Sequence, residues 1–151
     1  MNCNDKTGCE LPEILLTNKA SSTVNSQQTQ ITFVTDPICS ACWALEPVWR
    51  RLLLNYDIKV NYIHGGLLPG WKGFGDAKNG ILKPTDVIPH WQHVAEYSGQ
   101  PIDSSVWATD PLSNSFIICK AALAVRFLQA DLEASFIRKV REQLFIHGIN
   151  I

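Results

Sequence analysis

The feature that most constrains this chain is a pair of cysteines, Cys39 and Cys42, between a predicted strand and a predicted helix. Residues 31–35 are β-branched and aromatic and end at a proline turn, which is typical of a buried strand. From residue 40 to residue 56, apolar side chains recur every three or four positions, which predicts an amphipathic helix. The pair therefore lies at the N-terminal end of a helix that directly follows a strand.

The segments after this junction predict an α/β start followed by helices. Alternating apolar and polar side chains over residues 58–63 indicate a second strand, so strand, helix and strand form a βαβ unit with parallel strands and a right-handed crossover. Residues 67–84 contain frequent glycine and proline and predict a loop. Three helices are then expected, over residues 85–98, 113–129 and 131–147.

The last predicted helix carries an apolar side chain at every fourth position. These residues are Leu132, Phe136, Val140 and Leu144. Such spacing places them on one helix face, so we expect them to face the core and the charged residues, Arg141 included, to lie on other faces. Asp131 is expected to cap the start of this helix and Gly148 to stop it.

These elements divide the chain into a polar, flexible arm (residues 1–30), a βαβ unit (31–66) and a helical block (67–151). Two parallel strands do not make an independently stable sheet, because stable sheets have three or more strands. We therefore expect the sheet to be incomplete in this chain. Either residues 13–17 add an edge strand, or further chain once followed residue 151; we favour the second.

Charge and hydropathy exclude several classes of function. Thirteen Lys and Arg against fourteen Asp and Glu leave a net charge of −1, without the basic excess of a nucleic-acid-binding protein. The longest apolar stretch, residues 116–125, is interrupted by Lys120 and falls short of the roughly 20 residues of a membrane span. The N-terminus lacks the apolar segment of a signal peptide, and the five cysteines are an odd number, so we expect a cytoplasmic protein with reduced thiols.

The spacing of Cys39 and Cys42 fits either zinc binding or redox chemistry. A structural zinc site needs a second cysteine pair or paired histidines, and none follows, so we expect neither metal nor cofactor. At a helix start, unpaired backbone N–H groups and the helix dipole stabilise a thiolate. We therefore expect Cys39 to have a lowered pKa and to be the nucleophile, and Cys42 to resolve the mixed disulfide.

The residues around the pair resemble the thioredoxin superfamily, and within it the DsbA-like family. Asp-Pro-Ile-Cys-Ser-Ala-Cys-Trp-Ala-Leu-Glu-Pro (residues 36–47) is similar to the signature of cytosolic DsbA-family proteins, and Gly-Gly-Leu-Leu-Pro (65–69) to their exit from the second strand. The resemblance implies a thioredoxin-like fold with an inserted helical domain, which residues 67–151 fit. It also implies a later strand that begins with a cis-proline; no segment here matches it, so we expect a chain truncated before that strand.

Four neighbours are expected to support the pair or to line a substrate groove beside it: Asp36, Pro37, Trp43 and Pro47. Asp36 either raises the pKa of Cys39 by repulsion or, more simply, forms a turn with Pro37 where the strand ends. Pro47 lies inside the helical pattern and predicts a kink there.

These features predict a thiol–disulfide oxidoreductase that acts on protein or small-molecule disulfides together with a redox partner. The alternative is a non-enzymatic thioredoxin-like adaptor that delivers a protein to the ClpXP protease. A third class, the DsbA-like enzymes of glutathione chemistry such as kappa-class transferases, is disfavoured because both cysteines are retained. The unpaired sheet edges also predict self-association.

Other candidate residues have simpler interpretations. Asp86, His90 and His93 share one face of a predicted helix with metal-ligand spacing, but surface histidines are the simpler interpretation. Cys3 and Cys9 are interpreted as thiols of an unstructured tail rather than a metal site or a disulfide.

Five apolar residues are expected to pack in the core: Cys119, Trp71, Phe74, Trp91 and Trp107. One or two of the four aromatic residues are alternatively expected to line an apolar substrate groove near Trp43.

Overall fold

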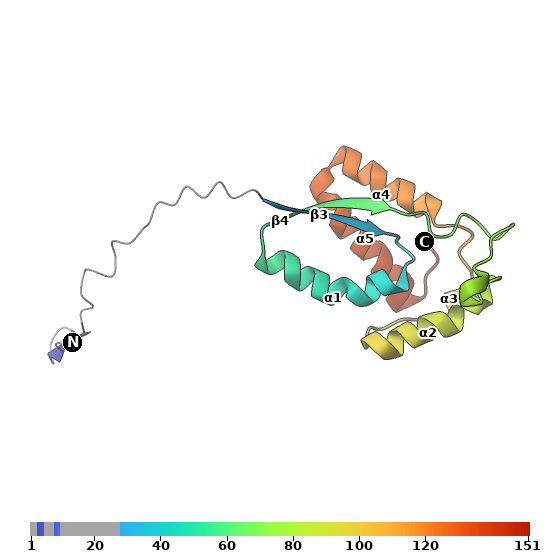
Figure 1. Cartoon of the computed structure of the whole chain (residues 1–151), viewed down its shortest axis with the longest axis horizontal. Helices are drawn as coiled ribbons and strands as arrows, with labels where there is room; N and C mark the ends of the chain where they lie inside the picture. Colours follow the sequence, from blue (N-terminus) through green and yellow to red (C-terminus); the bar gives the residue numbers. More distant parts are fainter. Residues whose placement is uncertain (1–2, 5–7, 10–27) are drawn as a thin grey trace.

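The computed structural model describes residues 3–4, 8–9 and 28–151 and shows an α/β arrangement (Figure 1). Its main elements are, in order, β1 (Cys3–Asn4), β2 (Gly8–Cys9), β3 (Thr29–Thr35), α1 (Ser40–Asn55), β4 (Ile58–His64), α2 (Val87–Ser98), α3 (Val106–Thr109), α4 (Phe116–Leu128) and α5 (Glu133–Arg141). Short helical turns cover Ala77–Asn79, Pro84–Asp86 and Ala130–Leu132, and a π-helical segment covers Glu142–Ile146. The predicted strands and helices are present, with shifted ends.

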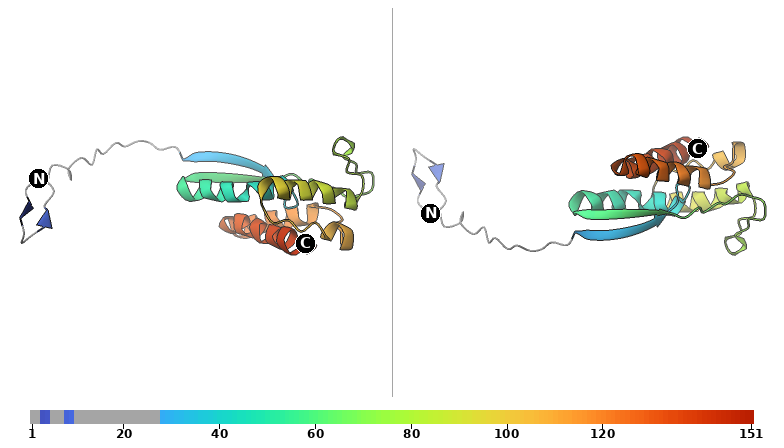
Figure 2. Two further views of the ribbon diagram at one scale, coloured as in Figure 1. Left: turned by 90° about the horizontal axis from the view of Figure 1, so that it is seen from below. Right: turned by 90° about the horizontal axis from the view of Figure 1, so that it is seen from above.

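Strands β3 and β4 pair in parallel, and α1 is the crossover between them. The register runs from Thr29 opposite Ile58 to Thr35 opposite His64. Figure 2 shows the strands at one surface of the molecule, with the helices behind them. On the outer face Val34 is 63% exposed and its register partner Ile63 is 45% exposed. Within the described residues the β3–β4 sheet has two strands, so the prediction of an incomplete sheet is confirmed.

The core joins the start of α1 to the helical block through aromatic contacts. Trp43 of α1 stacks on Phe145, with ring centroids 5.6 Å apart and planes 8° from parallel. Phe145 also packs on Trp91 at 4.6 Å, and Trp91 meets Trp107 edge-on at 5.2 Å. All four side chains are buried. Because these contacts span the cysteine-bearing helix, α2, α3 and the end of the chain, they hold the helix start rigidly against the helical block.

The buried face of α5 differs from the predicted one. Glu133, Ile137 and Arg141 are buried, whereas Leu132 is 44% exposed. Arg141, which we expected away from the apolar stripe that faces the core, is therefore buried, while Leu144 of that stripe is buried as expected. The physical reason is pairing: the carboxylate of Glu133 lies 2.9 Å from His64 Nε2 at the end of β4, and Arg141 Nη1 lies 3.4 Å from the carboxylate of Glu46 on α1, so neither charge is left alone in the interior.

Several predicted boundaries also change. Strand β3 begins at Thr29, two residues inside the expected arm, and α5 begins after a helical turn that contains Asp131, whose side chain makes no cap. Gly148 follows the last helical segment with φ = 60°, as a stop glycine requires. Cys3–Asn4 and Gly8–Cys9 form a small antiparallel pair rather than an unstructured tail. The predicted edge strand at residues 13–17 lies outside the described residues.

In the part of the chain that is described, no helix has both the length and the apolar character to cross a bilayer.

Candidate active site

The cysteine pair lies at the junction of β3 and α1. Cys39 is the N-cap residue of α1, and its Sγ accepts the backbone N–H of Cys42 at 3.3 Å. A turn in which the N–H of Cys39 donates to the carbonyl of Asp36 (3.1 Å) brings the chain from the strand into the helix. Both thiols are half-buried and reduced. The sequence-based placement of the pair at a helix start is therefore confirmed.

The two thiols titrate as one coupled pair rather than independently. A hydrogen bond from the Cys39 thiol lowers the pKa of Cys42 to about 6, with further help from Thr35 and Arg141. The same hydrogen bond, together with burial, raises the pKa of Cys39. At neutral pH the pair therefore carries one negative charge and one proton, shared between two sulfurs. The expectation of a lowered pKa at Cys39 is therefore wrong: the pKa of Cys39 is raised, and the lowered pKa is that of Cys42.

Alkylation of the reduced pair is expected to follow this low pKa. Because the thiolate forms as pH rises through about 6, the iodoacetamide rate should rise between about pH 5 and 7, well below the midpoint near 8.5 of an ordinary cysteine. Because Cys39 lines two cavities and Cys42 only one of them, the label is expected on Cys39. The measurement labels the reduced chain with iodoacetamide at a series of pH values, quenches samples at fixed times, and quantifies the labelled peptides by mass spectrometry. Cys119 is the internal control, because burial raises its pKa to about 11. A midpoint near 8.5 for the pair would contradict the shared-proton arrangement.

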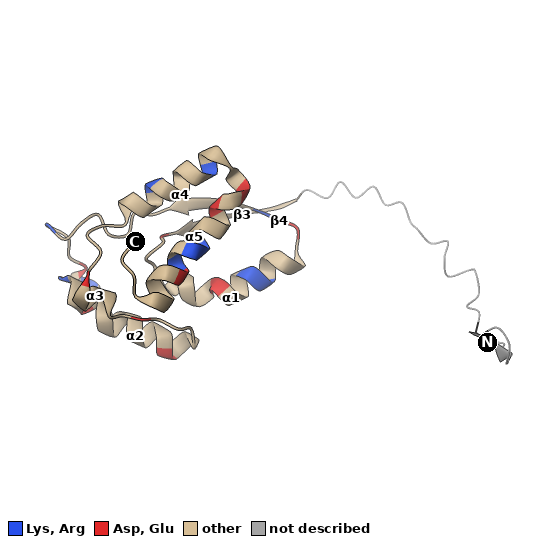
Figure 3. Cartoon of the chain, turned by 180° about the vertical axis from the view of Figure 1, so that it is seen from behind, with Lys and Arg blue, Asp and Glu red and all other residues tan. Residues whose placement is uncertain are grey.

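Arg141 supplies a positive charge that acts on both thiols of the pair. Its guanidinium is 2% exposed and donates to the Thr35 hydroxyl and to the Asp36 carbonyl (3.2 Å). Its Nη1 also lies 3.4 Å from the carboxylate of Glu46 on α1. Figure 3 shows this basic stretch of α5 beside the acidic position of α1. Sequence reasoning missed both Arg141 and Thr35, because no local signal marks a partner about a hundred residues away in the chain.

Asp36 fastens the end of β3 to two later segments. One carboxylate oxygen accepts the N–H of Ile38 at 3.0 Å, forming the turn that was the simpler of the two predictions for this residue. The other accepts the N–H of Leu67 at 2.7 Å and the hydroxyl of Ser115 at 3.0 Å. Asp36 therefore holds the exit of β4 and the start of α4 against the cysteine turn, and Ser115 is a further supporting residue that the sequence did not indicate.

The other three predicted neighbours have structural positions. Pro37 is fully buried, and Trp43 lies in the core, where its indole N–H donates to the carbonyl of Pro101 at 3.0 Å. Trp43 therefore supports the helix start from the core side and lines neither of the two cavities beside Cys39. Pro47 lies within α1, which continues to Asn55. Since proline has no N–H, the carbonyl of Trp43 lacks its usual helical donor there.

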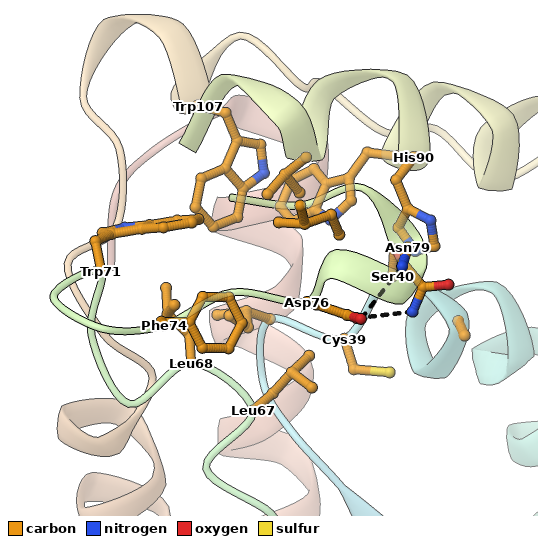
Figure 4. Close-up of a pocket in the computed structure, with 15 residues that line it drawn as sticks. Cys39, Ser40, Leu67, Leu68, Trp71, Phe74, Asp76, Asn79, His90 and Trp107 are labelled. Atoms are coloured by element: carbon orange, nitrogen blue, oxygen red, sulfur yellow. Dashed lines mark hydrogen bonds between the residues drawn. The ribbon is translucent and has the colours of Figure 1, made fainter. Parts of the chain in front are cut away.

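Two cavities meet at Cys39. The larger, here called the aromatic cavity, has a volume of about 210 Å³, and Figure 4 shows Cys39 at its edge. Its walls include all four aromatic residues of the earlier alternative: Trp71, Phe74, Trp91 and Trp107. The second, of about 200 Å³, lies on the sheet side between Val34, Gly65 and Leu67 and also contains Cys42. Cys39 is thus reached from both sides, which favours it as the attacking sulfur.

The remaining candidates do not form a second site. Asp86 accepts the backbone N–H groups of Leu82 and Lys83, and His90 and His93 are exposed. Within the described part of the chain, no three side chains of the metal-binding types gather. Cys119 is 5% exposed, as predicted for a core residue.

Comparisons with known proteins give a matching family model and similar curated proteins. A family model described as Thioredoxin matches residues 32–151. The chain is 29% identical over 153 residues to the ClpXP adapter protein SpxH of Halalkalibacterium halodurans, covering 99% of this chain and 49% of that protein. The SpxH protein of Bacillus subtilis is 29% identical over 81% of this chain and 40% of its own length. The chain thus spans half or less of the length of these relatives.

Solved structures show the same fold. The cytosolic disulfide reductase DsbM from Pseudomonas aeruginosa superposes with a TM-score of 0.63 at 20% identity, over 80% of this chain and 57% of that one. The structure of DsbM with GSH gives a TM-score of 0.61 at 18% identity, with the same coverage. The prediction of a thioredoxin-like fold of the DsbA type is therefore confirmed.

Proposed function

Since the chain belongs to the thioredoxin family, we propose that Cys39 and Cys42 form a dithiol–disulfide couple that reduces disulfides of protein or small-molecule substrates. The observation that carries this proposal is the N-cap geometry, in which Cys39 Sγ accepts the Cys42 N–H while the two thiols share one proton. This arrangement supplies a thiolate at neutral pH and a second thiol one helical turn away. No metal or cofactor takes part, and the expected location is the cytoplasm, where thiols are kept reduced.

The exchange proceeds in two balanced steps. The Cys39 thiolate attacks one sulfur of the substrate disulfide, so a mixed disulfide forms and the other substrate sulfur leaves as a thiolate and takes up a proton. Cys42, after losing its proton, then attacks Cys39 Sγ, closing the Cys39–Cys42 disulfide and releasing the second substrate thiol. The chain loses two electrons and the substrate gains two. A thiol or dithiol reductant, the redox partner in this scheme, restores the pair.

A second candidate function is that of an adaptor. It is favoured by similarity to the SpxH adapter of H. halodurans over nearly the whole of this chain. An adaptor of this kind binds a client protein and a protease component, and it has no need for turnover at Cys39. The two candidates differ in whether the dithiol cycles.

The test is steady-state reduction of a fluorescent peptide disulfide by the chain with excess dithiothreitol. Turnover above the rate with dithiothreitol alone, lost in Cys39→Ser and in Cys42→Ser, is the expected result. Cys119→Ser is the matched control and should retain turnover, because this thiol is buried and its pKa is raised to about 11. Equal rates with and without the chain would reject the reductase proposal and leave the adaptor as the supported function.

A further inference from the structure

A third cavity, here called the arginine cavity, lies between α1, α5 and the sheet, away from the cysteine pair. Its volume is about 200 Å³, and neither Cys39 nor Cys42 is among the described residues that line it. Phe33 and Tyr62, which are register partners on β3 and β4, contribute the sheet side of its wall. Trp49 of α1 packs on the Phe33 ring at 4.7 Å and donates its indole N–H to the Tyr62 hydroxyl at 3.2 Å. These rings give the cavity an aromatic floor, and its other apolar residues are Leu53, Ala134 and Ile137.

The arginine cavity is strongly cationic. Among the described residues, the charged side chains of its lining are those of Arg50, Arg138, Arg141 and Glu46. Three cations against one anion leave an excess of two positive charges, and Figure 3 shows basic positions on both helices. The Glu46 carboxylate is shared, because it lies 3.4 Å from Arg141 Nη1 and 3.8 Å from Arg138 Nη1. The neighbouring Glu142 does not cancel the excess, since it pairs with Lys139 as well as with Arg138.

Two guanidinium nitrogens of this lining are buried without an acceptor. Within the described part of the chain, Arg141 Nε and Arg138 Nη1 have no hydrogen-bond partner. The Arg141 side chain is 3% exposed, so bulk water does not replace the missing acceptor there. A buried donor without an acceptor is destabilising and calls for a partner such as a bound ion. An anionic oxygen in the cavity supplies both an acceptor and the missing negative charge.

We propose that the arginine cavity binds a small monocarboxylate with an apolar body, whose carboxylate pairs with Arg138 and Arg141 while the body packs on the aromatic floor. The planar guanidinium group matches a carboxylate in shape and charge. The volume is below the roughly 300–1,000 Å³ of pockets that hold drug-sized ligands, so the ligand is smaller than these. A phosphate fits less well, because the aromatic floor cannot hydrogen-bond to its remaining oxygens.

Arg141 links this cavity to the cysteine pair. Its guanidinium donates to the Thr35 hydroxyl and to the Asp36 carbonyl, and its positive charge lowers the pKa of Cys42. A carboxylate bound at Arg141 offsets that charge, so the thiolate loses part of its stabilisation. By linkage, formation of the thiolate also weakens binding of the carboxylate. The ligand is therefore an effector of the dithiol; this consequence rests on the proposed disulfide exchange, whereas the binding does not.

The first test is a ¹H–¹⁵N NMR titration of the reduced chain at pH 7 with benzoate. Benzamide carries the same ring without the charge, acetate the charge without the ring, and inorganic phosphate a different anion. Benzoate is expected to bind about tenfold or more tightly than each of the three, because it alone satisfies both the arginines and the floor. Equal affinity for benzoate and benzamide, or tighter binding of acetate or phosphate than of benzoate, would overturn the inference.

Two variants locate the binding. Arg138→Met removes one of the unpaired donors, and Ala134→Phe fills the cavity from an exposed position on α5; each is expected to weaken benzoate about tenfold. The matched controls are Arg51→Met on α1 and Ala124→Phe on α4, because both residues are exposed and lie outside the lining. The controls should retain the affinity of the unchanged chain. An affinity that both Arg138→Met and Ala134→Phe leave unchanged would overturn the inference.

The second test follows the cysteine pair. Saturating benzoate is expected to move the alkylation midpoint upward from about 6, and benzamide to leave it in place. An unmoved midpoint in the benzoate-bound chain would overturn the placement of the carboxylate at Arg141. A midpoint near 8.5 without any ligand would instead reject the thiolate of the proposed function, while the titration still decides the binding.

Discussion

Replacing Arg141 with methionine is expected to lower the free energy of unfolding by about 3 kcal/mol, because it removes the closer and more buried of the two cations beside the Glu46 carboxylate, the other being Arg138 at 3.8 Å. The side chains of Arg141 and Glu46 are 3% and 12% exposed, with 3.4 Å between Nη1 and Oε2. The change also removes the donors to the Thr35 hydroxyl and the Asp36 carbonyl. Urea unfolding followed by circular dichroism and by tryptophan fluorescence measures the loss. Coincident transitions from the two probes are needed for a two-state free energy.

The matched control is Arg138→Met, one helical turn earlier on α5. The Arg138 side chain is 32% exposed and lies 2.7 Å from Glu142 and 3.8 Å from Glu46; because it is partly exposed and Arg141 still faces Glu46 in this variant, the loss should be at most about 1 kcal/mol. Arg141→Met should in addition move the alkylation midpoint of the pair upward from about 6, since the positive charge of Arg141 lowers the pKa of Cys42. Equal destabilisation by the two variants, with an unmoved midpoint, would contradict the role given to Arg141.

The second large effect is expected at Asp36. In Asp36→Ala the backbone N–H of Ile38 loses its acceptor in a buried environment, and the N–H of Leu67, a residue that is 55% exposed, loses a part-buried one. An unsatisfied buried donor costs about 1–3 kcal/mol, so the free energy of unfolding should fall by about 3 kcal/mol. The Ser115 hydroxyl also loses its bond of 3.0 Å to the carboxylate. Urea unfolding of the reduced chain is again the measurement.

Asp57→Ala is the matched control for this change. Asp57 is exposed and accepts a single described side-chain hydrogen bond, from Gln28 at 2.6 Å, so its loss should stay within about 0.5 kcal/mol. If Asp36→Ala were as mild as Asp57→Ala, the carboxylate of Asp36 would not be what fastens the β4 exit and the α4 start to the cysteine turn.

Much of the local structure was predictable because it depends on short-range patterns. The β-branched run before Asp36 forms β3, the apolar spacing after Cys39 forms α1, and the pair lies at the N-cap between them. The capping bond is equally local. The backbone N–H of Cys42 donates to Cys39 Sγ, and the two residues are only three positions apart in the chain. The expectation of redox chemistry at the pair therefore rested on adjacent residues, without knowledge of the rest of the fold.

The same local pattern gave only part of the buried face of the last helix. Of the stripe Leu132, Phe136, Val140 and Leu144, Leu144 is fully buried and Leu132 is 44% exposed, and the structure also buries the charged residues Glu133 and Arg141, one position further along. Charged side chains enter a core only when partners meet them there. Those partners, His64 for Glu133 and Glu46 for Arg141, lie 69 and 95 positions away in the chain. Periodicity within one helix contains no information about them.

The sequence by itself determined the βαβ start, the helical block and the position of the cysteine pair, because each depends on residues within a few turns of one another. Only the tertiary structure decided which groups stabilise the thiolate of the pair and which residues surround Cys39. The positive charge that stabilises the thiolate of the pair is that of Arg141, which bonds to Thr35 from 106 positions further along the chain. The aromatic cavity is assembled from the β3–α1 junction, the 67–81 loop, α2 and α3. Electrostatic stabilisation and cavity shape depend on distance in space, which packing sets and linear spacing does not record.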